Sequence, residues 1–214
     1  MKSYAVLGLG RFGTALAKEL ALSGMEVIAA DSSEKLVEQV ADYTTQAIVA
    51  DLTDEEAIRE LGLHNVDAAA ICMSESLEAS VLCIMIAKEL GIPQVVAKAP
   101  NRRIGEIYKK VGADKVIFPE EETGIRTAHM MMSANFLDFQ DISTSMRLVE
   151  IKPKKQWIGK TLYELELRKK YGLNIVAIVT KDGDVESNIR PDAVINESDL
   201  LWAFVSEKNI RKLE

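Results

Sequence analysis

The sequence predicts a doubly wound α/β domain with a parallel sheet, followed by a smaller α+β domain. Apolar runs alternate with stretches of helical periodicity through the first two thirds of the 214 residues, which is typical of strands alternating with helices. A glycine-rich turn follows the first apolar run and opens the first helix, with the residues Gly8-Leu9-Gly10-Arg11-Phe12-Gly13. Beyond residue 145 the alternation stops, so a second, different domain is expected there.

The first half of the sheet is predicted from three apolar runs that are each followed by a helix. Phe12, Leu16 and Leu20 recur every four residues after the glycine-rich turn, which predicts a helix over 11–23. The other elements of this half are strands over 4–7, 26–30 and 46–50, a helix that Ser32 or Ser33 caps and that ends at Ala41, and a short helix that Thr53 caps and that ends at Leu61.

The second half restarts the pattern at 66–73, an unbroken apolar run of the kind that a strand buried on both faces requires. The other elements expected in this half are helices over 76–90 and 102–111 and strands over 94–99 and 115–118. A further helix over 122–135 is expected to lead from this half into the last third of the chain. Six strands in two halves form the Rossmann arrangement, in which ligands lie beyond the carboxyl ends of the strands.

The last third of the chain predicts a small α+β domain after a polar stretch, 141–145, that we interpret as a hinge. We expect strands over 146–151, 175–180 and 200–206, a helix that begins at Lys160 or Thr161 and ends at Lys170, and a hairpin turn at Asp182-Gly183. The expected organisation is an N-terminal domain over 1–123, a crossover helix with its linker over 124–143, and a C-terminal domain over 144–214.

The glycine-rich turn predicts a nucleotide pocket. Gly8 permits the tight turn, Gly10 leaves no side chain between the backbone and a pyrophosphate, and Gly13 lets the helix pack closely on the strand. The free N–H groups at the helix start favour an anion. Asp31, at the tip of the second strand, is placed to accept hydrogen bonds from ribose hydroxyls. Ser32 follows it where an arginine would recognise the 2′-phosphate of NADP, which argues against NADP.

Composition and charge exclude other classes of protein. The net charge of −7 argues against a nucleic-acid surface, because phosphate neutralisation needs a basic face. The chain enters a strand at once and has no run of about eighteen apolar residues, so we expect neither a signal peptide nor a membrane span, and a cytosolic protein. Cys72 and Cys83 lack the spacing of metal ligands and are expected to be buried.

The sequence shows no catalytic acid, base or nucleophile in the smaller domain, where a dehydrogenase would bind its substrate. Such an enzyme requires a general acid or base and a substrate pocket beside the cofactor. The smaller domain contains neither His64 nor His129 and no Ser/His/Asp or Cys/His constellation. We therefore predict a sensor, not an enzyme, in which the ligand selects between conformations. A small NAD-dependent oxidoreductase and an NADH-binding transcription regulator stay as alternatives, although the latter would need a DNA-binding helix-turn-helix that does not appear.

Several segments together carry a family resemblance. They are the string over 6–13, Asp31-Ser32, Ala50-Asp51, Lys98-Ala99, Gly112-Ala113-Asp114 with Pro119-Glu120, and 168–172. These segments resemble the RCK proteins, regulators of potassium conductance, and the whole chain is similar to the cytosolic regulatory subunits of Ktr-type potassium uptake systems. Arg11 and Phe12 make the glycine string more specific than a plain GxGxxG, because many Rossmann enzymes carry smaller residues there.

The resemblance implies a gating subunit without enzymatic activity. Such subunits are homo-oligomers, dimers assembling to an octameric ring, on the inner face of the cell membrane beneath a potassium-translocating subunit of the KtrB or TrkH type. ATP would favour the conducting ring and ADP the inactive one, and NAD or NADH can occupy the same cleft. Mg²⁺ or Ca²⁺ would accompany ATP. Cyclic di-AMP could bind the C-terminal domain at Leu162, Tyr163, Arg168, Tyr171, Asn174 and Ile175, residues whose alternative roles are core packing and a helix-end cation.

The resemblance also assigns site residues. The nucleotide-binding set is Gly8, Leu9, Gly10, Arg11, Phe12, Gly13, Asp31, Ser32, Asp51, Leu52, Met73, Ser74, Lys98 and Glu120. Arg11 would reach terminal phosphates and distinguish ATP from ADP, or else be a solvated surface arginine. Asp51 and Leu52 match the adenine side, although Asp51 could merely begin the next helix, and Lys98 is a plausible phosphate contact.

Glu120 is expected to help hold the divalent cation. Taken by themselves, Glu120, Glu121 and Glu122 are explained by the helix dipole, which stabilises carboxylates at a helix start. The resemblance favours the metal role for Glu120 alone, since Mg²⁺ and Ca²⁺ prefer oxygen ligands and a phosphate would complete the coordination.

Overall fold

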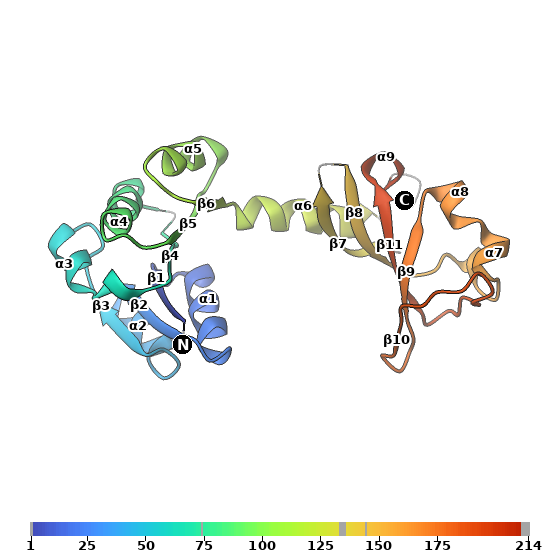
Figure 1. Ribbon diagram of the computed structural model, residues 1–214, viewed down its shortest axis with the longest axis horizontal. Coiled ribbons are helices and arrows are strands. Elements are labelled where there is room, and N and C mark those ends of the chain that lie inside the picture. Colours follow the sequence, from blue (N-terminus) through green and yellow to red (C-terminus); the bar gives the residue numbers. More distant parts are fainter. Residues whose placement is uncertain (1, 74, 133–135, 144, 211–214) are drawn as a thin grey trace. The chain divides into compact units, whose positions relative to one another are not determined.

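The computed structural model describes residues 2–73, 75–132, 136–143 and 145–210 (Figure 1). The chain divides into two compact units, Met1–Glu121 and Glu122–Glu214, called unit 1 and unit 2 below. Among the helices that the structure describes, none combines the length and the apolar character needed to cross a lipid bilayer.

Unit 1 contains a six-stranded parallel sheet with the strand order β3-β2-β1-β4-β5-β6. The strands are β1 (Ser3–Leu7), β2 (Glu26–Asp31), β3 (Gln46–Val49), β4 (Ala68–Ile71), β5 (Gln94–Lys98) and β6 (Lys115–Ile117). The helices are α1 (Arg11–Leu22), α2 (Glu34–Ala41), α3 (Glu55–Glu60), α4 (Leu77–Glu89) and α5 (Arg102–Lys110), with a short 3₁₀ turn at Leu63–Asn65. Helix α6 (Pro119–Met132) begins in unit 1, and from Glu122 onward it belongs to unit 2. The doubly wound sheet predicted from the sequence is therefore confirmed.

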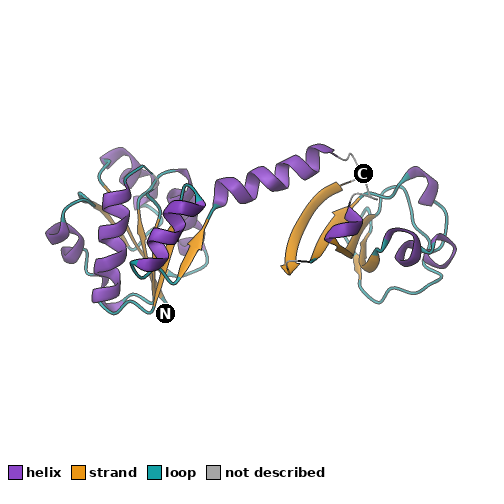
Figure 2. Cartoon of the chain, turned by 90° about the horizontal axis from the view of Figure 1, so that it is seen from above, coloured by secondary structure: helices purple, strands orange, loops and turns teal. Residues whose placement is uncertain are grey.

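Both faces of this sheet are buried under helices, as the purple helices around the orange strands of Figure 2 show. Ala5 and Leu7 of β1 lie in one buried cluster, whereas Val6 between them lies in a second cluster. Successive strand residues point to opposite faces, so each cluster fills one face. This arrangement explains why the strands have nearly continuous apolar sequences.

Unit 2 contains a five-stranded antiparallel sheet with the order β10-β9-β11-β8-β7. The strands are β7 (Phe136–Ser143), β8 (Met146–Ile151), β9 (Asn174–Val179), β10 (Val185–Glu186) and β11 (Leu200–Ser206), and the short helices are α7 (Leu162–Leu165), α8 (Leu167–Tyr171) and α9 (Glu207–Ile210), with a 3₁₀ turn at Lys155–Trp157. Trp157, Leu165, Leu167 and Leu201 lie in its core. The predicted α+β class of this region is confirmed.

The polar stretch 141–145 is not a hinge. Asp141 and Ser143 belong to β7 and pair with Arg147 and Met146 of β8. The Arg147 Nε atom lies 2.6 Å from an Asp141 carboxylate oxygen. Polar residues gather here because this is an exposed hairpin. Residue 144 lies outside the described residues, as do 133–135 at the end of the expected crossover helix.

The single helix expected up to Lys170 is two short helices. Glu166 separates α7 from α8 with a φ of 48°, in the left-handed region. Leu165 and Leu167 are both buried although they are two residues apart, which would place them on nearly opposite sides of one continuous helix. The break at Glu166 lets both side chains reach the core. Thr161 caps α7 in a reciprocal capping box with Glu164.

Two helix starts in unit 1 also differ from expectation. Asp54, not Thr53, caps α3 by accepting a hydrogen bond from the Glu56 N–H. Ser33 occupies the cap position of α2 without a side-chain cap.

The helix expected over 122–135 begins three residues earlier, at Pro119. Proline suits the first helical position, because the N–H that it lacks would have no helical partner there.

Candidate functional site

In the glycine-rich turn (residues 8–13), the surroundings that require a glycine differ among its three glycine positions. Gly8 has a φ of +93°, and a Cβ atom there would lie 2.6 Å from the Met73 Cγ atom. A Cβ atom on Gly13 would overlap the Gly8 carbonyl oxygen. At Gly10, by contrast, no described heavy atom outside its chain neighbours lies within 4 Å of the position that a Cβ would take. Packing within the chain therefore explains Gly8 and Gly13, and the open space at Gly10 fits an external group such as a pyrophosphate.

Helix α1 begins directly behind this open space. All residues of α1 are described, and its start has neither a side-chain cap nor an acidic residue in the first turn. The starts of α4 and α5 differ, because the side chains of Ser76 and Asn101 accept hydrogen bonds from their first turns. The uncapped N–H groups of α1 are free to donate to an anion, as such groups at helix starts commonly do. Arg11 lies exposed in the same turn.

Asp31 ties the glycine-rich turn to the next helix. One carboxylate oxygen accepts the N–H of Leu9 at 2.6 Å, and the other accepts the N–H of Ser33 at 2.9 Å. Each carboxylate oxygen has a second lone pair, so two ribose hydroxyls could still donate to this side chain. Ser32, beside it, is exposed. Asp31 thus holds the loop that would surround the pyrophosphate and offers acceptors for the adjoining sugar.

The residues expected on the adenine side differ in exposure: the Asp51 carboxylate is exposed, whereas the Leu52 side chain is buried. The Asp51 carboxylate accepts hydrogen bonds from the hydroxyl and the N–H of Thr53, at 2.7 and 2.9 Å, which lowers the pKa of this exposed side chain. Asp51 therefore shapes the turn before α3, whose cap is Asp54. The side chains of Leu52 and Leu9 lie in the core, so only their backbone groups can face a ligand.

Lys98 connects the glycine-rich turn with the start of α6. Its ammonium lies 2.7 Å from the Glu120 carboxylate and 5.9 Å from the centre of the Phe12 ring. The hydrogen bond from Lys98 lowers the pKa of the Glu120 carboxyl. Burial raises the pKa of the neighbouring Cys72 thiol to about 12, in spite of Lys98, so this cysteine is neutral. Because Phe12 is in the first turn of α1, the Lys98 ammonium is a cation close to where a phosphate at the start of α1 would bind.

The remaining predicted residues add less. Met73 packs beside Gly8, and Ser74 lies outside the described residues. Within the described part of the chain, no group of three or more His, Cys, Asp or Glu side chains could hold a metal ion. Glu120 would thus need oxygen ligands from elsewhere, such as a bound phosphate.

Thr14 is a site residue that the sequence-based prediction did not include. Its hydroxyl donates a hydrogen bond to the Leu9 carbonyl at 2.6 Å and so fixes the glycine-rich turn from inside α1. A threonine directly after the last glycine of the motif was the available signal, because a hydroxyl in a first helical turn can reach back to the preceding loop.

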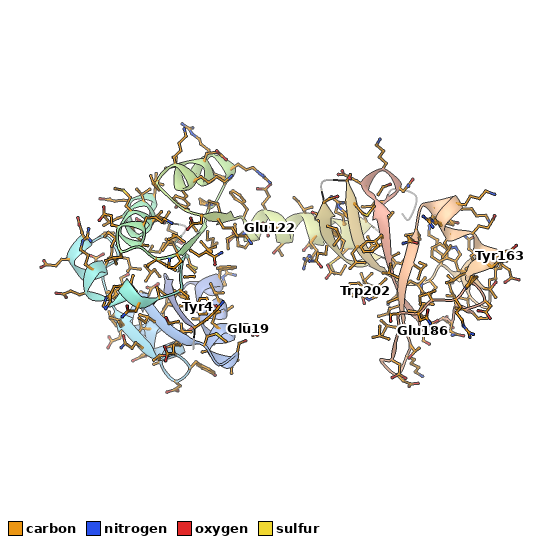
Figure 3. The ribbon with its side chains drawn as sticks, in the orientation of Figure 1. Tyr4, Glu19, Glu122, Tyr163, Glu186 and Trp202 are labelled. Atoms are coloured by element: carbon orange, nitrogen blue, oxygen red, sulfur yellow. The ribbon has the colours of Figure 1, made fainter. Side chains whose placement is uncertain are left out.

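In unit 2, the region suggested for cyclic di-AMP is partly core. Leu162, Tyr171 and Ile175 pack against the buried cluster. Tyr163 is 78% exposed and lies on α7 (Figure 3). Arg168 and Asn174 are also exposed. These three exposed side chains are the ones that could contact a ligand.

Two family models match separate parts of the chain. The TrkA-N domain model matches residues 4–119 and the TrkA-C domain model matches residues 146–214. Ktr system potassium uptake protein C of Bacillus subtilis is 38% identical over 213 residues, covering 100% of this chain and 96% of that protein. Ktr system potassium uptake protein A of the same organism is 35% identical with the same coverage.

Solved structures of the GsuK channel share the fold. One GsuK channel structure has a TM-score of 0.67 at 16% identity, and the match covers 100% of this chain and 39% of that chain. A GsuK channel bound to NAD has a TM-score of 0.64 at 15% identity. The chain thus spans less than half of these channel chains. With the TrkA-N model matching more than half of its residues and a relative 38% identical over its whole length, the chain belongs to the TrkA-type RCK family of potassium uptake proteins.

Proposed function

We propose that this chain is a nucleotide-sensing regulatory subunit of a potassium uptake system, without enzymatic activity of its own. The observation that carries the proposal is the open space at Gly10 in front of the uncapped start of α1. An adenine nucleotide would place its phosphates there and its ribose at Asp31, which already holds the Leu9 N–H. The names of the Ktr relatives supply the link to potassium uptake.

In this proposal, ATP and ADP compete for the cleft and stabilise different conformations. Arg11 is an exposed cation in the first turn of α1, where it would reach terminal phosphates, including those bound by a neighbouring subunit. NAD or NADH would bind the same cleft, as the NAD-bound GsuK channel suggests. Glu120 would hold Mg²⁺ or Ca²⁺ together with the terminal phosphate of ATP, because a hard cation prefers several oxygen ligands.

The nucleotide signal would pass to a membrane partner through the oligomer. We propose an N-terminal domain over 1–123 and a C-terminal domain over 144–214, to whose sheet the intervening segment 124–143 adds the strand β7, and dimers that assemble to an octameric ring. The ring would lie at the cytoplasmic face of the membrane, on a potassium-translocating subunit of the KtrB or TrkH type. Cyclic di-AMP is a second candidate ligand, for which the exposed Tyr163 and Arg168 of unit 2 would be contacts.

Replacement of Gly10 by alanine tests the site. The backbone at Gly10 has a φ of −59°, which alanine adopts, and the space is open, so the fold should be unaffected. The added methyl group would occupy the phosphate position, and we expect ADP and ATP affinity, measured by isothermal titration calorimetry, to fall at least about tenfold.

Gly124→Ala is the matched control, because a Cβ atom at Gly124 also meets open space and no positive φ opposes it. Its nucleotide affinity should equal that of the unchanged protein. Strong NADH binding that ATP cannot displace would contradict the proposal and favour the oxidoreductase or redox-sensor alternative.

A further inference from the structure

One ammonium group, that of Lys98, lies near residues in the first turns of both α6 and α1. Lys98 lies at the end of β5, and its ammonium is 2.7 Å from the carboxylate of Glu120, which is in the first turn of α6. The same ammonium lies 5.9 Å from the ring of Phe12, in the first turn of α1. A phosphate bound at the start of α1 would therefore stand close to the cation that Glu120 already binds.

The exposure of this pair makes it suited to an exchange of partners. The side chain of Lys98 is only 11% exposed, whereas that of Glu120 is 68% exposed. A largely buried ammonium depends on an anionic partner, because it has lost most of its water. Glu120, in contrast, can separate from Lys98 and be solvated with little penalty.

The neighbouring acidic residue lacks these properties. Glu121 pairs with Arg102 at 2.9 Å, and the Arg102 side chain is 75% exposed. Water and salt screen the interactions of such an exposed cation. Glu121 thus carries the same charge at the same helix start as Glu120, without a link to Lys98.

We propose that Lys98 exchanges one anion for another when nucleotide binds. In the ligand-free protein it binds Glu120, and when a nucleotide phosphate occupies the start of α1 it binds the phosphate and releases Glu120. The occupancy of the α1 site is thereby reported at the first turn of α6, the helix that continues into unit 2. This inference rests on the proposed nucleotide site and adds how its occupancy reaches the next helix.

The exchange makes Glu120 a competitor of the phosphate in the absence of divalent cations. ADP affinity measured by calorimetry in EDTA should therefore increase about fivefold in Glu120→Gln, which frees Lys98 from an ion pair of ordinary strength. Glu121→Gln, the matched control, should change the affinity by less than about twofold, since it removes only a screened charge.

A double-mutant cycle with Lys98→Met identifies the cation through which Glu120 acts. Methionine keeps much of the apolar stem of the lysine and removes its charge, so ADP affinity should fall about tenfold. In the Lys98→Met background, Glu120→Gln should have no more effect than Glu121→Gln, because the competition no longer exists.

The results separate this inference from the function on which it rests. ADP binding by the unchanged protein, with equal affinities of Glu120→Gln and Glu121→Gln, would overturn the exchange and leave the nucleotide site intact. A gain from Glu120→Gln that persists without Lys98 would also overturn it. If the unchanged protein fails to bind ADP, ATP or NAD, the proposed function itself is wrong. The comparison of the two glutamine variants does not depend on the folding of Lys98→Met.

Discussion

Helices α1 and α6 both begin near Lys98, and their first turns differ in charge. Helix α1 starts with Gly10 and Arg11, without an acidic first turn in any of its described residues. Helix α6 starts with Pro119, which three glutamates follow. The positive end of a helix dipole stabilises negative charge. Helix α6 therefore carries the stabilising anions in its own sequence, whereas the start of α1 is suited to an anion that comes from outside the chain.

Lys98 makes this difference functional. In the ligand-free protein its nearest anion is Glu120, which belongs to the chain and is mostly exposed. A nucleotide phosphate would be a second anion at almost the same place, bound by the N–H groups of α1 as well. In the proposed exchange, the carboxylate at the start of α6 would thus pair with Lys98 until a phosphate binds.

The largest effect is expected from the glycine that the protein's own packing requires. Gly13→Ala places a methyl group on the Gly8 carbonyl oxygen, so the start of α1 cannot keep its distance from the sheet. Unfolding in urea should show a loss of about 3 kcal/mol in stability, at the upper end for overpacked sites. A loss under about 1 kcal/mol would mean that α1 can move away from the sheet. Gly10→Ala, with open space, should stay within about 0.5 kcal/mol of the unchanged protein.

The next effect concerns the choice between ATP and ADP. Arg11→Ala removes the exposed cation at the start of α1, and we expect the ratio of ATP to ADP affinity to fall about tenfold, the usual cost of a lost charge-assisted contact. Asp31→Ala is the contrasting variant. It should weaken both nucleotides alike, because Asp31 holds the Leu9 N–H and faces the ribose that they share. An unchanged ratio in Arg11→Ala would make this arginine an ordinary surface residue.

Most of the fold could be predicted from periodicity and glycine positions. The unbroken apolar run 66–73 indicated a strand buried on both faces, and the structure places β4 there, with its side chains in the buried clusters of both faces. The errors arose where the local sequence is compatible with two different backbone structures. The polar residues of 141–143 suit a hinge and an exposed hairpin equally well, and the strand pairing of Asp141 and Ser143 with β8 decides for the hairpin. A left-handed Glu166 gives no signal in the sequence, because glutamate is a good helix former.

The site could be predicted only in part. The glycine motif and Asp31 follow from the spacing that a Rossmann nucleotide site requires, and the structure brings them together. Two further contacts depend on side-chain directions, which sequence spacing does not define. They are the hydrogen bond that Asp31 accepts from the Leu9 N–H and the one that the Thr14 hydroxyl donates to the Leu9 carbonyl. The pairing of Lys98 with Glu120 joins the end of β5 to the first turn of α6, which follows the neighbouring strand β6, so it required the order of the strands.

The smallest effects are those of the helix dipoles, and they should have opposite signs at the two helix starts. Glu122→Gln removes an anion near the start of α6 (Figure 3) and should lower stability by about 0.5 kcal/mol at low salt. Arg11→Ala removes a cation from the start of α1 and should raise the stability of the ligand-free protein by a similar amount, about 0.5 kcal/mol. Urea unfolding at low and high salt measures both. Glu186→Gln, on the exposed strand β10, is the control for loss of a carboxylate away from any helix start, with no expected change. If Arg11→Ala destabilised the ligand-free protein, Arg11 would contribute to folding. It could then not be explained as a residue that serves the ligand although its charge opposes the helix dipole.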